Sequence, residues 1–200
     1  MNQSRERGFQ LVEVVIVLAI IGLFFTAALP DLMRATARER VRSAAMEITA
    51  VMRLARSEAV KRSVRVAVKF ERDVDGLYTY CLYADGDGDG VANADIDTGI
   101  DPAIRRPRRL EQFGGRVGFG FPPGSVPPDP GDPRRRLGSL DDPIRFNRSD
   151  LASFDPIGSG TPGSVYITDH RTELAAVRVL GGSGRVQVLS YDRDADRWRR

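Results

Sequence analysis

One apolar stretch near the amino end limits what this chain can fold into. Residues 8–30 read GFQLVEVVIVLAIIGLFFTAALP, and Glu13 is their only charged residue. The segment from Phe9 to Leu29 reaches the roughly 17 to 25 residues that a membrane-spanning helix needs. An ionised carboxylate near a membrane face is costly unless it finds a partner. We therefore expect a membrane helix in which Glu13 is paired with a cation.

A cleaved secretory signal does not explain this stretch. Such a signal ends in a small-x-small cleavage site after its apolar core. Here residues 26–28 lead directly into Leu29 and Pro30, and helical patterning continues beyond them. A plain membrane anchor, in turn, gives no reason for the carboxylate of Glu13.

The same region resembles the amino-terminal signal of type IV pilins and pseudopilins. The shared features are Arg7-Gly8-Phe9, Glu13, an apolar helix that contains Gly22, and Pro30 at its end. The resemblance implies that a prepilin peptidase removes a leader of residues 1–8 by cleaving after Gly8, and that Phe9 is methylated. It also implies assembly into a filament with other pilins or pseudopilins, in which residues 9–30 form the transmembrane and filament-core helix.

The rest of the chain divides into a helical part and a strand-rich part. Over residues 31–63 apolar side chains recur at three- and four-residue steps, which predicts an amphipathic continuation of the helix. Residues 64–200 carry alternating patterns and turn signals, which predict a β-rich globular domain. The predicted fold is α+β and pilin-like, with one long helix packed on antiparallel β-sheet. The resemblance places the globular domain in the periplasm and the single membrane pass in the inner membrane.

Strand and loop signals can be placed along the globular domain. Alternating or β-branched runs predict strands at residues 64–70, 77–83, 116–121, 144–146, 164–168, 175–180 and 185–191. Proline, glycine and arginine dominate residues 101–142, and apart from the strand at 116–121 we expect most of this segment to form a long loop without regular structure. The end of the helix and the first hairpin, at residues 54–83, resemble the GspH/FimT branch of the pseudopilin family.

The sequence offers no catalytic constellation. Its one histidine, His170, has no metal-ligand or triad spacing around it. Its one cysteine, Cys81, cannot form an internal disulfide and is expected to be buried. Neither a Walker pattern nor a strand-to-helix GxGxxG is present. We therefore expect a protein that is not an enzyme.

An aspartate-rich segment matches the opening of a calcium loop. Carboxylates stand at alternate positions and Gly90 follows them, as hard oxygen ligands around a sharp turn require. The twelfth position, which should supply a bidentate acid, is Ile96. The candidate calcium ligands are Asp85, Asp87, Asp89, Asp95 and Asp97. The alternative is a solvated, glycine-rich connection.

Arginine clusters raise the question of DNA binding. The net charge is only +3 at pH 7, but clustered arginines can neutralise phosphates. DNA-binding pilins of the GspH/FimT branch carry a Gly-Arg-x-Arg motif near the carboxyl end, and here Gln187 replaces its second arginine. The candidate DNA-binding residues are Arg185, Arg193, Arg197, Trp198, Arg199 and Arg200. The alternative is a solvated basic tail.

These observations favour one function over two others. The expected function is that of a minor pseudopilin, a structural subunit of the type II secretion pseudopilus. Its implied partners are other pseudopilins, the prepilin peptidase and the inner-membrane assembly platform. The first alternative is a DNA-binding minor pilin of a type IV pilus that acts in DNA uptake. The second is a membrane-anchored calcium-binding domain.

Overall fold

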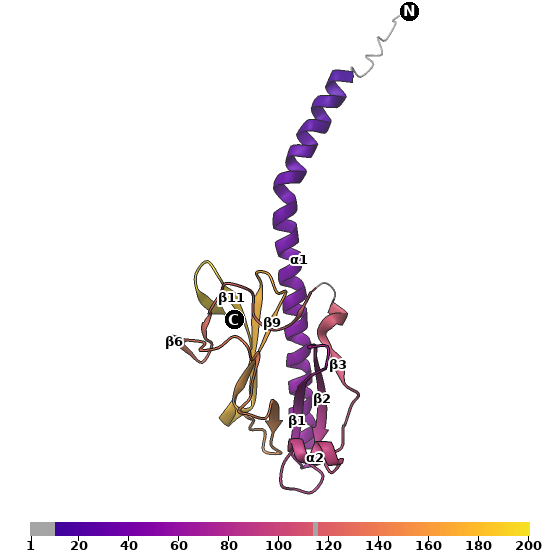
Figure 1. Ribbon diagram of the computed structural model, residues 1–200, viewed down its shortest axis with the longest axis vertical. Helices are drawn as coiled ribbons and strands as arrows, with labels where there is room; N and C mark the ends of the chain where they lie inside the picture. The colour runs from indigo at the N-terminus through magenta and orange to yellow at the C-terminus, as the bar shows by residue number, and fades with distance from the viewer. Residues whose placement is uncertain (1–10, 114–115) are drawn as a thin grey trace, which may run out of the picture. The chain divides into compact units, whose positions relative to one another are not determined.

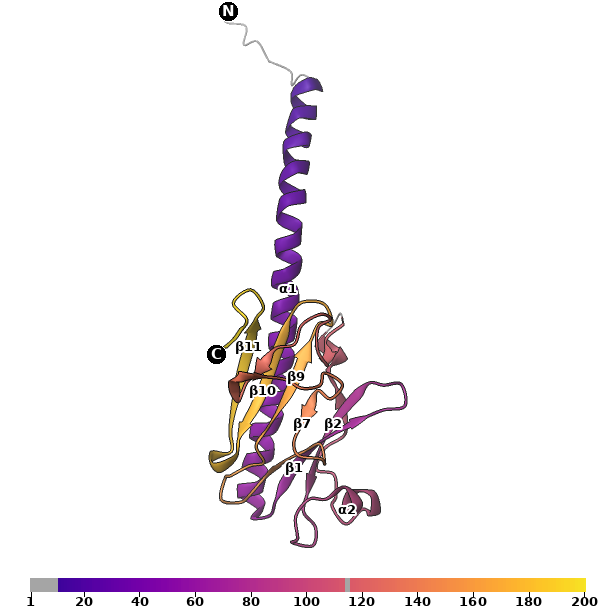
Figure 2. The same ribbon diagram turned by 60° about the vertical axis from the view of Figure 1, so that its left-hand side comes forward.

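The computed structural model describes residues 11–113 and 116–200 (Figures 1 and 2). The helices are α1 (Leu11–Arg62) and α2 (Asn93–Thr98), with short 3-10 helices η1 (Leu110–Phe113) and η2 (Gly181–Ser183). The strands are β1 (Val66–Arg72), β2 (Tyr78–Ala84), β3 (Arg108–Arg109), β4 (Gly118–Phe119), β5 (Pro128–Asp129), β6 (Asp132–Arg136), β7 (Ile144–Arg145), β8 (Leu151–Phe154), β9 (Gly163–Thr168), β10 (Leu174–Leu180), β11 (Arg185–Asp192) and β12 (Arg197–Arg199). The chain forms two compact units, Met1–Arg38 and Glu39–Arg200.

The first part of α1 exposes apolar side chains. Pro30 lies inside the helix without ending it, since a proline removes only one helical hydrogen bond. Large exposed residues such as Leu23, Phe24 and Phe25 are each more than 60% accessible. In the part of the chain that the structure describes, α1 is the one helix long and apolar enough to cross a membrane. This segment is therefore suited to a membrane or to the interior of an assembly.

From Glu39 onward, α1 buries the apolar stripe that the sequence predicts. Ile48, Met52 and Ala55 are completely buried, whereas Arg42 and Arg53, which lie off the stripe, are exposed. The buried residues recur at three- and four-residue steps because those positions share one face of a helix. Burial of each large side chain stabilises the fold by about 1.5–3 kcal/mol.

Two antiparallel sheets pack against this face of α1 (Figure 2). The first sheet has the strand order β3-β2-β1-β8, and the second has the order β12-β11-β10-β9-β4, with β7 also paired to β9. One hydrophobic core contains α1 residues together with Phe70 and Phe154 of the first sheet and Val165 and Val177 of the second. The α+β, pilin-like arrangement that the sequence predicts is confirmed.

The long loop is more ordered than expected. Within residues 101–142 the chain forms β4, which lies in the predicted strand, and also β3 and the hairpin β5–β6, which the sequence did not predict. Pro128 and Pro133 are tolerated there because the hairpin is a two-stranded sheet of its own, in which a missing N–H costs little. The predicted strand at 116–121 is reduced to Gly118–Phe119.

Outside residues 101–142, one α-helix and two strands were also missed. These are α2, β8 and β12. Each is at most 6 residues long, too short for a periodic pattern to be recognised. β12 also shows that residues 197–199 form a strand paired with β11 and not a loose tail.

Candidate functional site

The acidic segment brings three carboxylates together. Oxygen atoms of Asp85, Asp87 and Asp89 lie within 4.8 Å of one another. Asp85 is buried, and its Oδ1 accepts a hydrogen bond from the Gly88 N–H at 2.7 Å. A hydrogen bond with Asp87, followed by the negative charge of Asp87, raises the pKa of Asp89. Crowded carboxylates of this kind are the ligands that calcium prefers, so these three residues could hold a divalent cation.

The two remaining aspartates of the predicted calcium set, both on α2, differ from each other. Partial desolvation, and after it the charge of Asp87, raises the pKa of Asp95, so Asp95 lies within the field of the cluster. Asp97 instead lies 3.7 Å from the Lys69 ammonium group on β1. The charge of Asp87 therefore acts on Asp95, whereas Asp97 pairs with Lys69 of the first sheet.

Asp101 organises this loop, and sequence reasoning did not single it out. It is 1% exposed, and its two carboxylate oxygens accept the N–H groups of Gly86 at 3.0 Å and Ala92 at 2.9 Å. A Cβ at Gly86 would lie 2.0 Å from the Ile100 carbonyl oxygen, so only glycine fits there. The sequence signal that could have identified Asp101 is its position directly before Pro102, because the residue before a proline favours an extended backbone.

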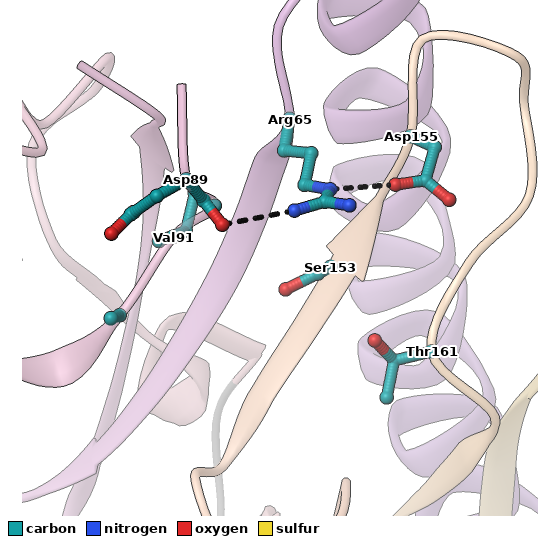
Figure 3. Close-up of a pocket in the computed structure, with 8 residues that line it drawn as sticks. Arg65, Asp89, Val91, Ser153, Asp155 and Thr161 are labelled. Atoms are coloured by element: carbon teal, nitrogen blue, oxygen red, sulfur yellow. Dashed lines mark hydrogen bonds and ion pairs between the residues drawn. The ribbon is translucent and has the colours of Figure 1, made fainter. Parts of the chain in front are cut away.

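Arg65 joins the acidic loop to the turn after β8 (Figure 3). Its Nη1 donates to the Asp89 carbonyl oxygen at 3.0 Å, and its Nε donates to the Asp155 Oδ1 at 3.0 Å. A hydrogen bond from Ser159, together with Arg65, holds the pKa of Asp155 below its usual range. The guanidinium lines an open groove of about 420 Å³ that Ser153 and Thr161 also line. The Arg65 guanidinium is already paired with the Asp155 carboxylate. Arg65 therefore links the acidic loop to the turn after β8.

Trp198 packs against aromatic residues of the second sheet and is half-buried. Its ring centroid lies 5.2 Å from that of Tyr191 and 6.2 Å from that of Tyr166. Its Nε1–H donates to the Pro128 carbonyl oxygen at 2.7 Å. Through this hydrogen bond Trp198 connects the β5–β6 hairpin to the second sheet.

The candidate arginines do not form one cluster. Arg185 stands opposite Leu180 at the start of β11, whereas Arg199 stands opposite Ser190. Five strand residues separate the two positions by about 17 Å. Arg199 forms an ion pair with Asp192. Arg193, Arg197 and Arg200 are also exposed, and they lie close in sequence to this ion pair.

Of the residues predicted for processing and assembly, the structure describes only Glu13. Gly8 and Phe9, at the predicted cleavage and methylation position, lie outside the described residues. Glu13 lies in the first turn of α1 and is exposed.

Comparison with known proteins identifies the family. Residues 44–188 match the family model described as type II transport protein GspH. No curated protein matches the chain, and no solved structure matches it. The matched residues run from the buried face of α1 to β11 and cover well over half of the chain. The chain therefore belongs to the GspH family of type II transport proteins.

Proposed function

We propose that this protein is a minor pseudopilin, a non-catalytic subunit of the type II secretion pseudopilus. The family match over residues 44–188 carries the proposal. The exposed apolar segment of α1 supports it, because such a helix can rest in the inner membrane before assembly and in the filament core afterwards. In this account the unit from Glu39 to Arg200 lies in the periplasm.

Processing and assembly are linked in this proposal. Cleavage after Gly8 gives Phe9 a new α-amino group, which is positively charged near neutral pH. Glu13 lies close to that new terminus, on the exposed first turn of α1. A carboxylate in apolar surroundings is costly alone and favourable beside a cation. The Phe9 amine of a neighbouring subunit supplies the cation and sets the axial register of the incoming chain.

The proposal is tested by secretion. In a host that carries the type II system, deletion of this chain lowers the amount of secreted enzyme in the medium, and the wild-type chain restores it. Gly8→Val, which blocks prepilin cleavage, does not restore secretion. Unchanged secretion together with lost DNA uptake would favour the alternative, a DNA-binding minor pilin.

One observation bears on that alternative. All five residues of β6 are exposed, among them Arg134, Arg135 and Arg136, and Arg136 pairs with Asp196 beside β12. Arginines of the long loop therefore lie near the carboxyl-terminal ones. Aspartates interleave both groups, however, and weaken their attraction for phosphates. We accordingly place secretion first and DNA binding second.

A further inference from the structure

A largely apolar pocket of about 480 Å³ lies between the β1–β2 turn and strand β4. Its walls are formed by Leu77, Tyr78, Leu110, Val117 and Phe119. The rings of Tyr78 and Phe119 meet edge to face, with centroids 5.6 Å apart. Ligand sites are commonly pockets of roughly 300–1,000 Å³ with apolar walls and a few polar groups. The size and lining suit apolar side chains from another molecule.

His170 is held at this pocket by an unusual backbone. Its φ is +57°, a left-handed conformation that is unfavourable for most residues other than glycine. Its N–H donates to Thr168 Oγ1 at 3.0 Å. A Cβ at Gly118 would lie 3.1 Å from the imidazole Nε2, and one at Gly120 would lie 2.8 Å from Cε1. The two glycines therefore make room for the ring on β4.

The pocket runs along the outer edge of the second sheet. Residues Arg116 to Phe119 all line it, and β4 is the terminal strand of the second sheet. Gly120 N–H donates to the Tyr166 carbonyl oxygen at 3.1 Å, and Phe119 stands opposite Ile167. Because hydrogen-bonded and non-bonded pairs alternate in antiparallel sheets, the N–H and C=O of Phe119 point away from β9. An extended peptide can add to such an edge.

The rim of the pocket is basic. Arg116 is exposed and lines it. Arg72 lies 6.0 Å from the centre of the Tyr78 ring, and its Nε donates to the Gly76 carbonyl oxygen at 3.3 Å. Among the lining residues that the structure describes, none is acidic. Burial lowers the pKa of His170, so the positive charge beside the pocket at neutral pH comes from Arg116 and Arg72.

We propose that the pocket and the β4 edge bind an extended segment of a partner polypeptide that carries an acidic residue next to a branched apolar one. The apolar side chain enters between Leu77 and Phe119, the carboxylate pairs with Arg116, and the peptide backbone meets that of Phe119. The proposal depends on the fold of the unit Glu39–Arg200 and not on membership in the pseudopilus. Either can therefore fail alone, because peptide binding and secretion are measured separately.

Fluorescence anisotropy of labelled peptides on the full chain in detergent tests the proposal. The probes are Gly-Ser-Asp-Leu-Ser-Gly and two matched peptides in which Asn replaces Asp or Ala replaces Leu. The Asp-Leu peptide binds saturably, and each matched peptide binds about tenfold more weakly, as expected for one lost charged hydrogen bond or one lost apolar contact. Equal affinities for all three peptides, or no saturable binding in the millimolar range, would overturn the proposal.

Matched variants locate the binding site. Leu77→Ser and Arg116→Gln weaken binding of the Asp-Leu peptide about tenfold, whereas Val74→Ser and Arg148→Gln leave it unchanged. Val74 belongs to the same turn as Leu77 but is 99% exposed and outside the pocket, and Leu77 itself is 42% exposed, so neither change empties the core. His170→Asn removes the ring while keeping a residue that tolerates positive φ, and it also weakens binding. Equal losses in the pocket variants and in their controls would contradict the assignment.

Discussion

At the residue scale, Glu13 is the side chain whose position the proposed assembly explains best. Glu13→Gln leaves membrane insertion and cleavage intact but lowers incorporation into the pseudopilus by at least about tenfold, because losing one partner of a desolvated ion pair costs about 3–5 kcal/mol. Glu13→Asp lowers it less. Incorporation is measured by immunoblotting sheared pseudopili against total membrane protein.

The control for this prediction lies on the same helix. Arg53 is exposed on α1 within the second unit, so Arg53→Gln also changes one charge but is expected to keep wild-type incorporation. A Glu13→Gln chain that entered pseudopili as well as the Arg53→Gln chain would rule out the pairing with Phe9. The family assignment would stand.

Asp101 offers a second test at a single residue. Asp101→Ala removes the acceptor of the part-buried N–H groups of Gly86 and Ala92, and a hydrogen bond to a charged group contributes about 1.5–3 kcal/mol. We expect the free energy of unfolding to fall by about 2–4 kcal/mol, measured by urea denaturation with circular dichroism. Asp97→Ala removes only an exposed contact with Lys69 and should cost less than about 1 kcal/mol. Similar losses in both variants would argue against Asp101 as the organiser of the loop.

At the element scale, the acidic loop is expected to gain stability when its charge is reduced. The folded protein raises the pKa of Asp89, so ionised Asp89 is disfavoured in the native state. This cost is present above the folded pKa and disappears as the pH falls below the ordinary pKa. At pH 7 with a chelator, Asp87→Asn therefore raises the melting temperature, since Asp87 is the main cause of the shift.

Calcium distinguishes a cation site from an open loop in the same measurement. A cation that binds only the native state stabilises it by about 2.7 kcal/mol at a hundredfold excess over Kd. We expect millimolar calcium to raise the melting temperature of the wild type and to have a much smaller effect on Asp87→Asn. An identical response of the two proteins would leave the solvated-loop interpretation.

The hairpin β5–β6 and strand β12 stabilise each other through Trp198. Trp198→Ala loses ring contacts with Tyr191 and the hydrogen bond to Pro128, and because the ring is only half-buried we expect a loss of about 2 kcal/mol. Trp198→Phe keeps a ring and loses about 1 kcal/mol. Chemical denaturation gives these values. Unchanged stability together with weaker, salt-dependent DNA binding would instead favour a stacking role for Trp198.

Sequence patterns predicted the elements that bury long periodic faces. The α1 stripe around Ile48 and Met52 and the hairpins β1–β2 and β10–β11 were correct because their patterns extend over many residues. The strand β8 has four residues, and its pairing with β1 depends on a contact between segments about 80 residues apart, which no local pattern encodes. The same reason explains why Arg65 and Asp101 were missed. Their importance depends on distant partners, namely Asp155 for Arg65 and Gly86 for Asp101.

At the scale of the whole molecule, the two units have contrasting surfaces. The unit from Glu39 to Arg200 buries its own core between α1 and two sheets. The apolar residues of the other unit, such as Leu18 and Phe24, remain exposed. An exposed apolar surface of this extent requires a membrane or neighbouring subunits to cover it. The proposed function supplies both in turn, the membrane before assembly and neighbouring subunits afterwards.

The most direct test is to measure the mass of the chain purified from membranes and to identify the proteins that co-purify with it. The chain, tagged at its carboxyl end, is produced with the prepilin peptidase and the other pseudopilins, extracted in mild detergent and analysed by mass spectrometry. The account predicts a polypeptide that begins at methylated Phe9 and co-purifies with other pseudopilins. A chain that still begins at Met1 and is recovered without any pseudopilin would contradict it.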